Sequence, residues 1–133
     1  MKLLKIPAVC VAALLFAVSC APTKELTYQI MPKDGTPTAG TVSFVQKGDE
    51  VTMTVKASGL TPGLHAIHLH EKADCSAPDF TSTGGHWNPT ESDHGRWGEG
   101  HFHRGDIGNL NADASGNAGM IFKTDKWCIG CKD

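Results

Sequence analysis

Short runs in which apolar and polar residues alternate constrain the fold of this chain more than any other feature of its sequence. The alternation is clearest in three runs, at 26–30, 42–46 and 51–56. Successive side chains of a β-strand point to opposite faces of a sheet, so a period of two predicts strands. Turn residues separate the runs, including Asp34-Gly35 and Lys47-Gly48-Asp49.

Three further strands are expected at 64–71, 107–112 and 118–124, the last two joined by a turn at 113–117. A length of 133 residues predicts one domain, and no helical period, internal repeat or linker is visible. The sequence therefore predicts an all-β sandwich or barrel. The net charge of −2 offers no basic field, so nucleic acid is not an expected partner.

The N-terminus has the pattern of an export signal. Lys2 and Lys5 precede an almost wholly apolar stretch at 6–18, which is too short to span a bilayer but suits a secretory signal. It ends in Ala17-Val18-Ser19-Cys20, which resembles a bacterial lipoprotein signal with Cys20 as the lipidated residue. We expect a signal peptide at 1–19, a tether at 20–25 and the folded domain at 26–133. The alternative is a plain signal peptide with an incidental cysteine.

On the lipoprotein interpretation, the protein is exported to the periplasm or cell envelope, where disulfides persist, and is anchored to a membrane through Cys20.

All seven histidines lie between Gly63 and Asp106, and most of that stretch is a Gly-, Pro- and Ser-rich segment at 72–105 with no visible period. A loop of this length is commonly functional. His68 and His70 share one strand face, with Cα atoms about 6.5 Å apart, so both can reach one metal ion.

The loop adds four further candidate ligands: His86, His94, His103 and Asp106. Three histidines with one carboxylate suit zinc, and imidazole suits copper equally well. His65 falls on the opposite strand face and is interpreted as a structural histidine bonded to backbone. His101 belongs to no such set and is interpreted as an exposed loop residue.

Taken together, GLHAIHLHE, the following Cys75, GGHWNP and HRGDIGNLNAD resemble the copper/zinc superoxide dismutase family, of the bacterial exported kind. The resemblance runs from about Leu26 to Thr124. It implies a Greek-key β-barrel of eight strands, of which about six are present here, and a long metal-binding loop. It also implies disproportionation of superoxide with copper and zinc as cofactors.

The resemblance further implies roles for matching residues. His68, His70 and His86 correspond to copper ligands and carry the catalysis. His86 corresponds to an imidazolate that bridges copper and zinc, and His94, His103 and Asp106 to the other zinc ligands. Cys75 corresponds to one half of a disulfide.

The sequence departs from the family after Thr124. The family's fourth copper histidine and the second cysteine of its disulfide lie further along, and no histidine follows His103 here. We therefore expect that the gene product is longer and that this chain is a C-terminally truncated part of it. We also expect the activity of this chain to be impaired. The alternative function is an exported lipoprotein that binds zinc and copper without turnover. Cys128 and Cys131 form a CxxC, for which a local disulfide is favoured over pairing with Cys75 or a redox or zinc role.

Overall fold

Six β-strands make up the regular structure of the protein, seen in a computed structural model that describes residues 22–33 and 35–131. They are β1 Lys24–Ile30, β2 Ala39–Lys47, β3 Glu50–Ser58, β4 Gly63–His68, β5 Asp106–Ala112 and β6 Ala118–Thr124. One turn of 3-10 helix, η1 at Thr81–Thr83, interrupts the long loop. The described part contains no α-helix, which confirms the all-β fold.

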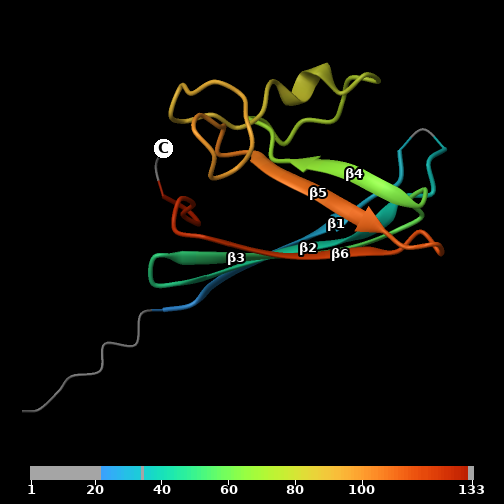
Figure 1. Cartoon of the computed structure of the whole chain (residues 1–133), viewed down its shortest axis with the longest axis horizontal. Helices are drawn as coiled ribbons and strands as arrows, with labels where there is room; N and C mark the ends of the chain where they lie inside the picture. The colour runs from blue at the N-terminus through green and yellow to red at the C-terminus, as the bar shows by residue number, and fades with distance from the viewer. Residues whose placement is uncertain (1–21, 34, 132–133) are drawn as a thin grey trace, which may run out of the picture.

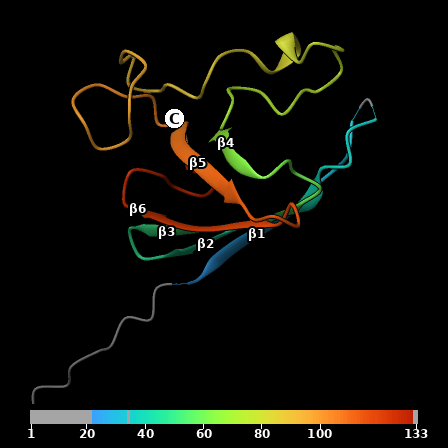
Figure 2. The same cartoon turned by 45° about the vertical axis from the view of Figure 1, so that its right-hand side comes forward.

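Four strands form one antiparallel sheet in the order β1-β2-β3-β6. The expected hairpin joins β2 to β3, with Gly48 in the left-handed conformation at φ 59° that favours glycine. Strands β4 and β5 pair antiparallel in a second sheet. Figures 1 and 2 both show this pair lying across the four-stranded sheet as a second layer, with the long loop above it.

The core lies between the two layers, and β3 contributes most of it. Val51, Met53 and Val55 alternate along β3 and are at most 1% exposed, as the period of two predicts. The second layer contributes Ile107 and Leu110 of β5 to this core. Two layers that bury facing apolar surfaces are the usual solution for antiparallel sheets.

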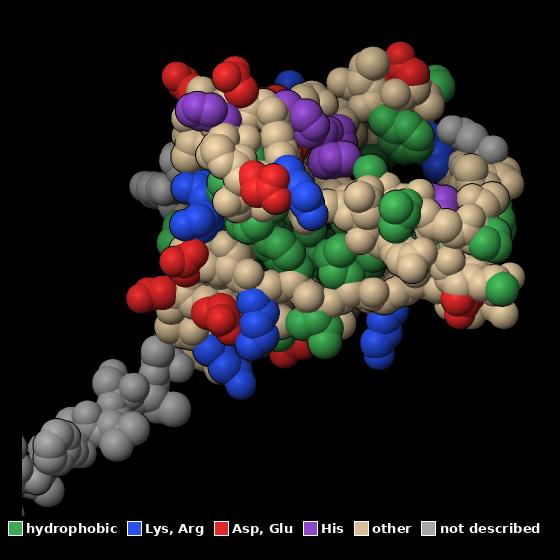
Figure 3. Space-filling view, in the orientation of Figure 1, with side chains coloured by type: hydrophobic (Ala, Val, Ile, Leu, Met, Phe, Trp, Pro, Cys, Tyr) green, Lys and Arg blue, Asp and Glu red, His purple; other side chains and the backbone are tan. Residues whose placement is uncertain are grey.

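The alternating side chains of β1 are less buried than the pattern predicts. Leu26 is 41% exposed and Tyr28 is 54% exposed, because β1 is an edge strand of its sheet. Together with Phe44, Trp87 and Trp127 they line an apolar groove of about 280 Å³. Hydrophobic side chains are visible below the histidines, between the two layers, in Figure 3.

Two strand boundaries differ from the sequence prediction. β1 begins at Lys24, so two residues assigned to the tether pair with β2. β4 ends at His68, not at Glu71, because a bulge between Ile67 and His68 interrupts its ladder with β5. His70 instead forms an isolated bridge with His86, and this change brings the strand residue into contact with the loop.

Candidate metal centre

Three backbone segments meet in a triangle of hydrogen bonds, and each segment carries candidate ligands. The amide of Leu69 donates to Gly105 O at 3.0 Å, Gly105 N donates to Trp87 O at 2.8 Å, and Trp87 N donates to Leu69 O at 2.8 Å. Leu69 stands between His68 and His70, Trp87 follows His86, and Gly105 precedes Asp106. The triangle therefore brings ligands from distant parts of the sequence to one place.

Gly105 is required by this triangle for its small size. A Cβ atom at this position would lie 2.2 Å from Leu69 O and 2.9 Å from Trp87 N. Real Cβ atoms do not approach backbone atoms so closely, so only glycine allows the two neighbouring segments to pack here.

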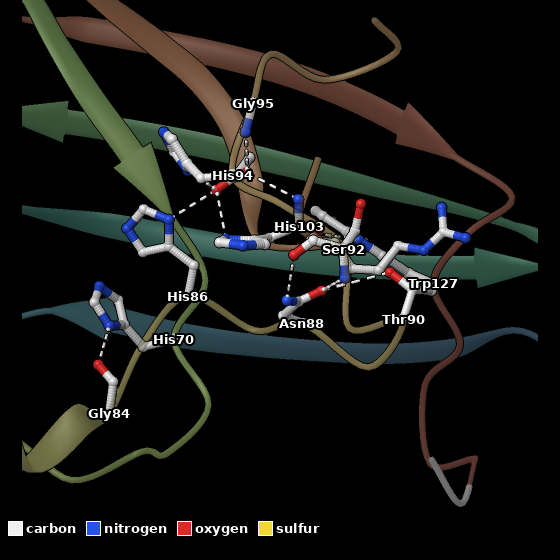
Figure 4. A network of polar contacts seen from close by, with 12 residues as sticks. His70, Gly84, His86, Asn88, Thr90, Ser92, His94, Gly95, His103 and Trp127 are labelled. Atoms are coloured by element: carbon white, nitrogen blue, oxygen red, sulfur yellow. Dashed lines mark hydrogen bonds and ion pairs between the residues drawn. The ribbon is translucent and has the colours of Figure 1, made fainter. Parts of the chain in front are cut away.

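Asp106 is the centre of the polar network and is only 3% exposed. Its Oδ2 accepts from the backbone amides of His103 at 2.8 Å and Gly95 at 3.2 Å. Its Oδ1 lies 2.7 Å from His86 Nδ1 and 3.1 Å from His94 Nδ1. Figure 4 shows His86, His94, Gly95 and His103 converging on one point.

The network fixes the charge of Asp106. Burial alone would raise the pKa of its carboxyl group, but the backbone donors of His103 and Gly95, with the His86 side chain, outweigh burial and lower the pKa to about 2. Asp106 is therefore a carboxylate at neutral pH. It offers negative charge to a cation as well as an oxygen ligand.

Four side chains form a compact donor set, named here the Asp106 cluster: His86, His94, His103 and Asp106. One ligand atom from each lies within 4.8 Å of the others. His103 Nδ1 is buried and has no hydrogen-bond partner among the described residues, although it lies 3.5 Å from Asp106 Oδ1. A buried nitrogen rarely stays unpaired, so this atom is free to bind an ion. Three nitrogens and one oxygen form a set that zinc prefers.

His68 and His70 lie beside the Asp106 cluster and meet it at His86. The rings of His68 and His86 stack with centroids 3.9 Å apart, and the His70 ring meets His86 edge-on at 5.3 Å. Burial lowers the pKa of His68, and the nearby His86 lowers it further, so the His68 imidazole is neutral near pH 7. Neutral imidazole is the form that binds metals.

The orientation of His70 comes from the end of η1. Its Nδ1 lies 3.1 Å from Gly84 O, an acceptor (Figure 4). The same nitrogen lies 3.0 Å from the buried hydroxyl of Thr83. A proton on Nδ1 that is donated to Gly84 O leaves the lone pair of Nε2 free. A hydrogen bond of this kind fixes the tautomer and orientation of a metal-binding histidine.

A hollow of about 720 Å³ gives solvent and small solutes access to this site. His68, His94 and Asp106 line one part of it, and Arg96, which pairs with Glu99 at 3.3 Å, is another lining residue. Histidine side chains are visible at the surface near the top of the molecule in Figure 3.

The two histidines excluded by the sequence analysis lie where it expected. His65 is half-buried, and its Nε2 donates to Thr61 O at 2.7 Å, which confirms the structural hydrogen bond to backbone. His101 is exposed in the loop.

Among the described cysteines, Cys128 and Cys131 form the favoured local disulfide, and Cys75 is free and exposed. The signal peptide and the lipidation site Cys20 lie outside the described residues. In residues 22–33 and 35–131, no helix has the length and apolar character needed to cross a membrane.

Thr83, Gly95 and Trp127 are among the contributors to the site that sequence reasoning missed. Thr83 positions His70, Gly95 donates to Asp106, and the Trp127 indole donates to Arg104 O at 2.9 Å. Two of these residues could have been suspected from their neighbours in the sequence. Thr83 precedes the Gly84-Gly85 pair, and Gly95 follows His94. Trp127 lies 23 residues from Arg104 in the sequence, and no local sequence pattern predicts their contact.

Comparison with known proteins gives a consistent result. The family model of copper/zinc superoxide dismutase matches residues 38–131. The copper chaperone for superoxide dismutase of Rattus norvegicus is 36% identical over 108 residues, 80% of this chain and 39% of that protein. An extracellular copper-zinc superoxide dismutase of Drosophila melanogaster is 38% identical over 99 residues, 71% of this chain and 54% of that protein.

A second extracellular copper-zinc superoxide dismutase, from Caenorhabditis elegans, is 40% identical over 78 residues, 59% of this chain and 35% of that protein. The chain thus spans between about a third and about half of the length of these relatives.

Proposed function

Because the chain belongs to the copper/zinc superoxide dismutase family, we propose that it disproportionates superoxide to dioxygen and hydrogen peroxide at a paired copper and zinc site. One observation carries the proposal: the His86 ring is shared between two groups of donors. Its Nδ1 faces Asp106 at 2.7 Å, while the ring stacks on His68 at 3.9 Å. An imidazole has two nitrogens, and each can bind a metal once the ring is deprotonated.

The Asp106 cluster fits zinc. It supplies four donors within 4.8 Å of one another, a buried carboxylate and an unpartnered His103 Nδ1. Zinc has no redox chemistry, and a closed four-ligand set is typical of a structural role. The long loop has almost no regular structure, so zinc bound at the Asp106 cluster would hold the loop in shape.

His68, His70 and His86 would hold copper, for which three imidazoles are suitable ligands. Copper, when bound, supplies the one-electron oxidation and reduction that superoxide needs. His86 is anchored through Nδ1 at Asp106 and can take up a proton at Nε2 and release it to a departing product. His70 is oriented by the contacts of its Nδ1 with Thr83 and Gly84, so its Nε2 is directed away from those contacts.

The test is reconstitution of the full chain with copper and zinc, followed by an assay of superoxide removal. We expect activity that depends on copper and falls at least a hundredfold in His86→Ala. A loaded protein in which His86→Ala changes nothing would disprove the proposal.

A second function has specific support. The Asp106 cluster is the one group of metal donors that lies within 4.8 Å in the described part of the chain, and His68 and His70 stand outside it. One relative is a copper chaperone for superoxide dismutase. The alternative is therefore a protein that binds zinc and copper without turnover. Tight binding of both metals without superoxide removal would establish it.

We further propose that the protein is an exported lipoprotein, anchored through Cys20 in the periplasm or cell envelope. The support is the sequence of residues 1–20. Metabolic labelling with a radioactive fatty acid tests it, because Cys20→Ser should abolish the label and release the protein from membranes. The longer gene product stays a prediction, to be tested by sequencing beyond the codon of Asp133.

A further inference from the structure

The Cys128–Cys131 disulfide closes an exposed loop next to the metal centre, and the proposed function gives it no role. Both cysteines are exposed to solvent. Between them Gly130 adopts φ 71°, the left-handed conformation that lets the chain turn back within four residues. A disulfide must be reached by a thiolate before it can exchange, and here both sulfur atoms belong to exposed residues.

Two side chains of the neighbouring sheet hold this loop, residues 128–131, in place. Gln46 of β2 accepts from the amide of Ile129 at 2.8 Å and directs its own Nε2 to Cys128 Sγ at 3.8 Å. Lys24 of β1 donates to Ile129 O. The Gln46 amide group is thus placed to stabilise negative charge on Cys128 sulfur, which makes Cys128 the better leaving group.

Trp127, the residue before the loop, connects it to the metal centre. Its side chain is 6% exposed, and the indole donates to Arg104 O at 2.9 Å. Arg104 lies in the turn in which Asp106 N donates to His103 O at 3.1 Å and His103 N donates to Asp106 Oδ2. One hydrogen bond therefore joins the loop to the turn that presents two members of the Asp106 cluster.

We propose that Cys128–Cys131 is a thiol–disulfide exchange site for an external dithiol, and that its reduction weakens metal binding at the Asp106 cluster by releasing Trp127 from Arg104. The incoming thiolate bonds to Cys131 Sγ, the Cys128–Cys131 bond breaks, and Cys128 leaves as a thiolate beside Gln46. The second thiol of the reductant then displaces Cys131. The dithiol is oxidised to a disulfide, and the two cysteines gain two electrons and two protons.

The coupling has an expected size. Loss of one hydrogen bond to a backbone carbonyl weakens a linked equilibrium about fivefold. We therefore expect the reduced protein to bind zinc about fivefold more weakly than the oxidised protein. This part rests on the proposed function, because it assumes that the Asp106 cluster binds zinc.

The experiment uses the full chain with Cys10, Cys20 and Cys75 replaced by Ser, so that only the CxxC can react. The folded protein is treated with dithiothreitol and desalted without oxygen. Thiols are then counted by iodoacetamide labelling and mass spectrometry. Zinc affinity of both forms is measured by competition with a chromophoric chelator, and amide hydrogen exchange at 103–106 is followed in the metal-free forms.

Two substitutions distinguish coupling through the Trp127–Arg104 hydrogen bond from a general loosening of the packing around Trp127. Trp127→Phe keeps an aromatic, though smaller, side chain and removes the N–H donor, so it should weaken zinc binding about fivefold and abolish the difference between the redox forms. Trp97→Phe is the matched control. Trp97 packs against Trp127 with centroids 5.9 Å apart, and the difference should survive in that variant.

We expect both cysteines to be labelled in folded protein and the amides of His103 and Asp106 to exchange faster after reduction. A disulfide that yields only on unfolding would overturn the exchange site. Equal zinc affinities with equal amide exchange in the two forms would overturn the coupling. If neither form binds zinc, the proposed function fails, while the amide exchange of the metal-free forms still decides the coupling.

Discussion

Replacing Gly105 with Ala tests how the backbone triangle builds the metal centre. The new Cβ would lie 2.2 Å from Leu69 O, so the two segments must separate by most of an ångström. That movement breaks the hydrogen bonds from Leu69 N to Gly105 O and from Gly105 N to Trp87 O. At about 1 kcal/mol net for each bond, the free energy of unfolding should fall by about 2 kcal/mol. For a domain of this size the melting temperature should fall by roughly 9 °C.

The same change should weaken zinc binding at least tenfold, because Asp106 follows Gly105 directly and moves with it. Urea unfolding and competition with a chromophoric chelator measure the two effects. Gly119→Ala is the matched control, since its Cβ would meet only Val55 O at an ordinary 3.5 Å. Equal stability and equal zinc affinity in the two variants would refute the role assigned to the triangle.

Four further substitutions give distinct outcomes. His103→Ala should weaken zinc binding at least a hundredfold, while His101→Ala should leave zinc affinity unchanged, because of these two histidines only His103 belongs to the Asp106 cluster; chelator competition compares them. Thr83→Val should weaken copper binding about tenfold with zinc affinity unchanged, because outer hydrogen bonds orient ligands such as His70; isothermal titration with each metal measures this. Met53→Ala should lower the free energy of unfolding by about 2–5 kcal/mol in urea, because Met53 is 0% exposed.

Much of the fold could be predicted from the sequence because the periods are local. The alternation along β3 placed Val51, Met53 and Val55 in the core, and the turn residues at 47–49 marked the hairpin. The end of β4 could not be predicted, because it depends on a bulge at His68 that is set by pairing with β5. The exposure of Leu26 also depends on tertiary context, since an edge strand and a central strand share the same pattern.

The candidate site followed from residue types and spacing more than from any structural pattern. Residue type made His86, His94, His103 and Asp106 candidate ligands, the family resemblance implied their roles, and the structure brings these four together. The sequence could not reveal how the four residues are brought together. Gly105 acts through its lack of a side chain and Trp127 through a contact 23 residues away, and neither effect leaves a local signal.

The shared position of His86 is the centre of the account, and spin coupling between two metals tests it most directly. Cobalt is placed in the Asp106 cluster as a substitute for zinc, copper(II) is added, and the copper signal is recorded by electron paramagnetic resonance. If His86 joins the two sites, the copper signal of the cobalt form is lost or strongly broadened, while the zinc form keeps it and His86→Ala restores it. An unchanged copper signal beside bound cobalt would contradict the account.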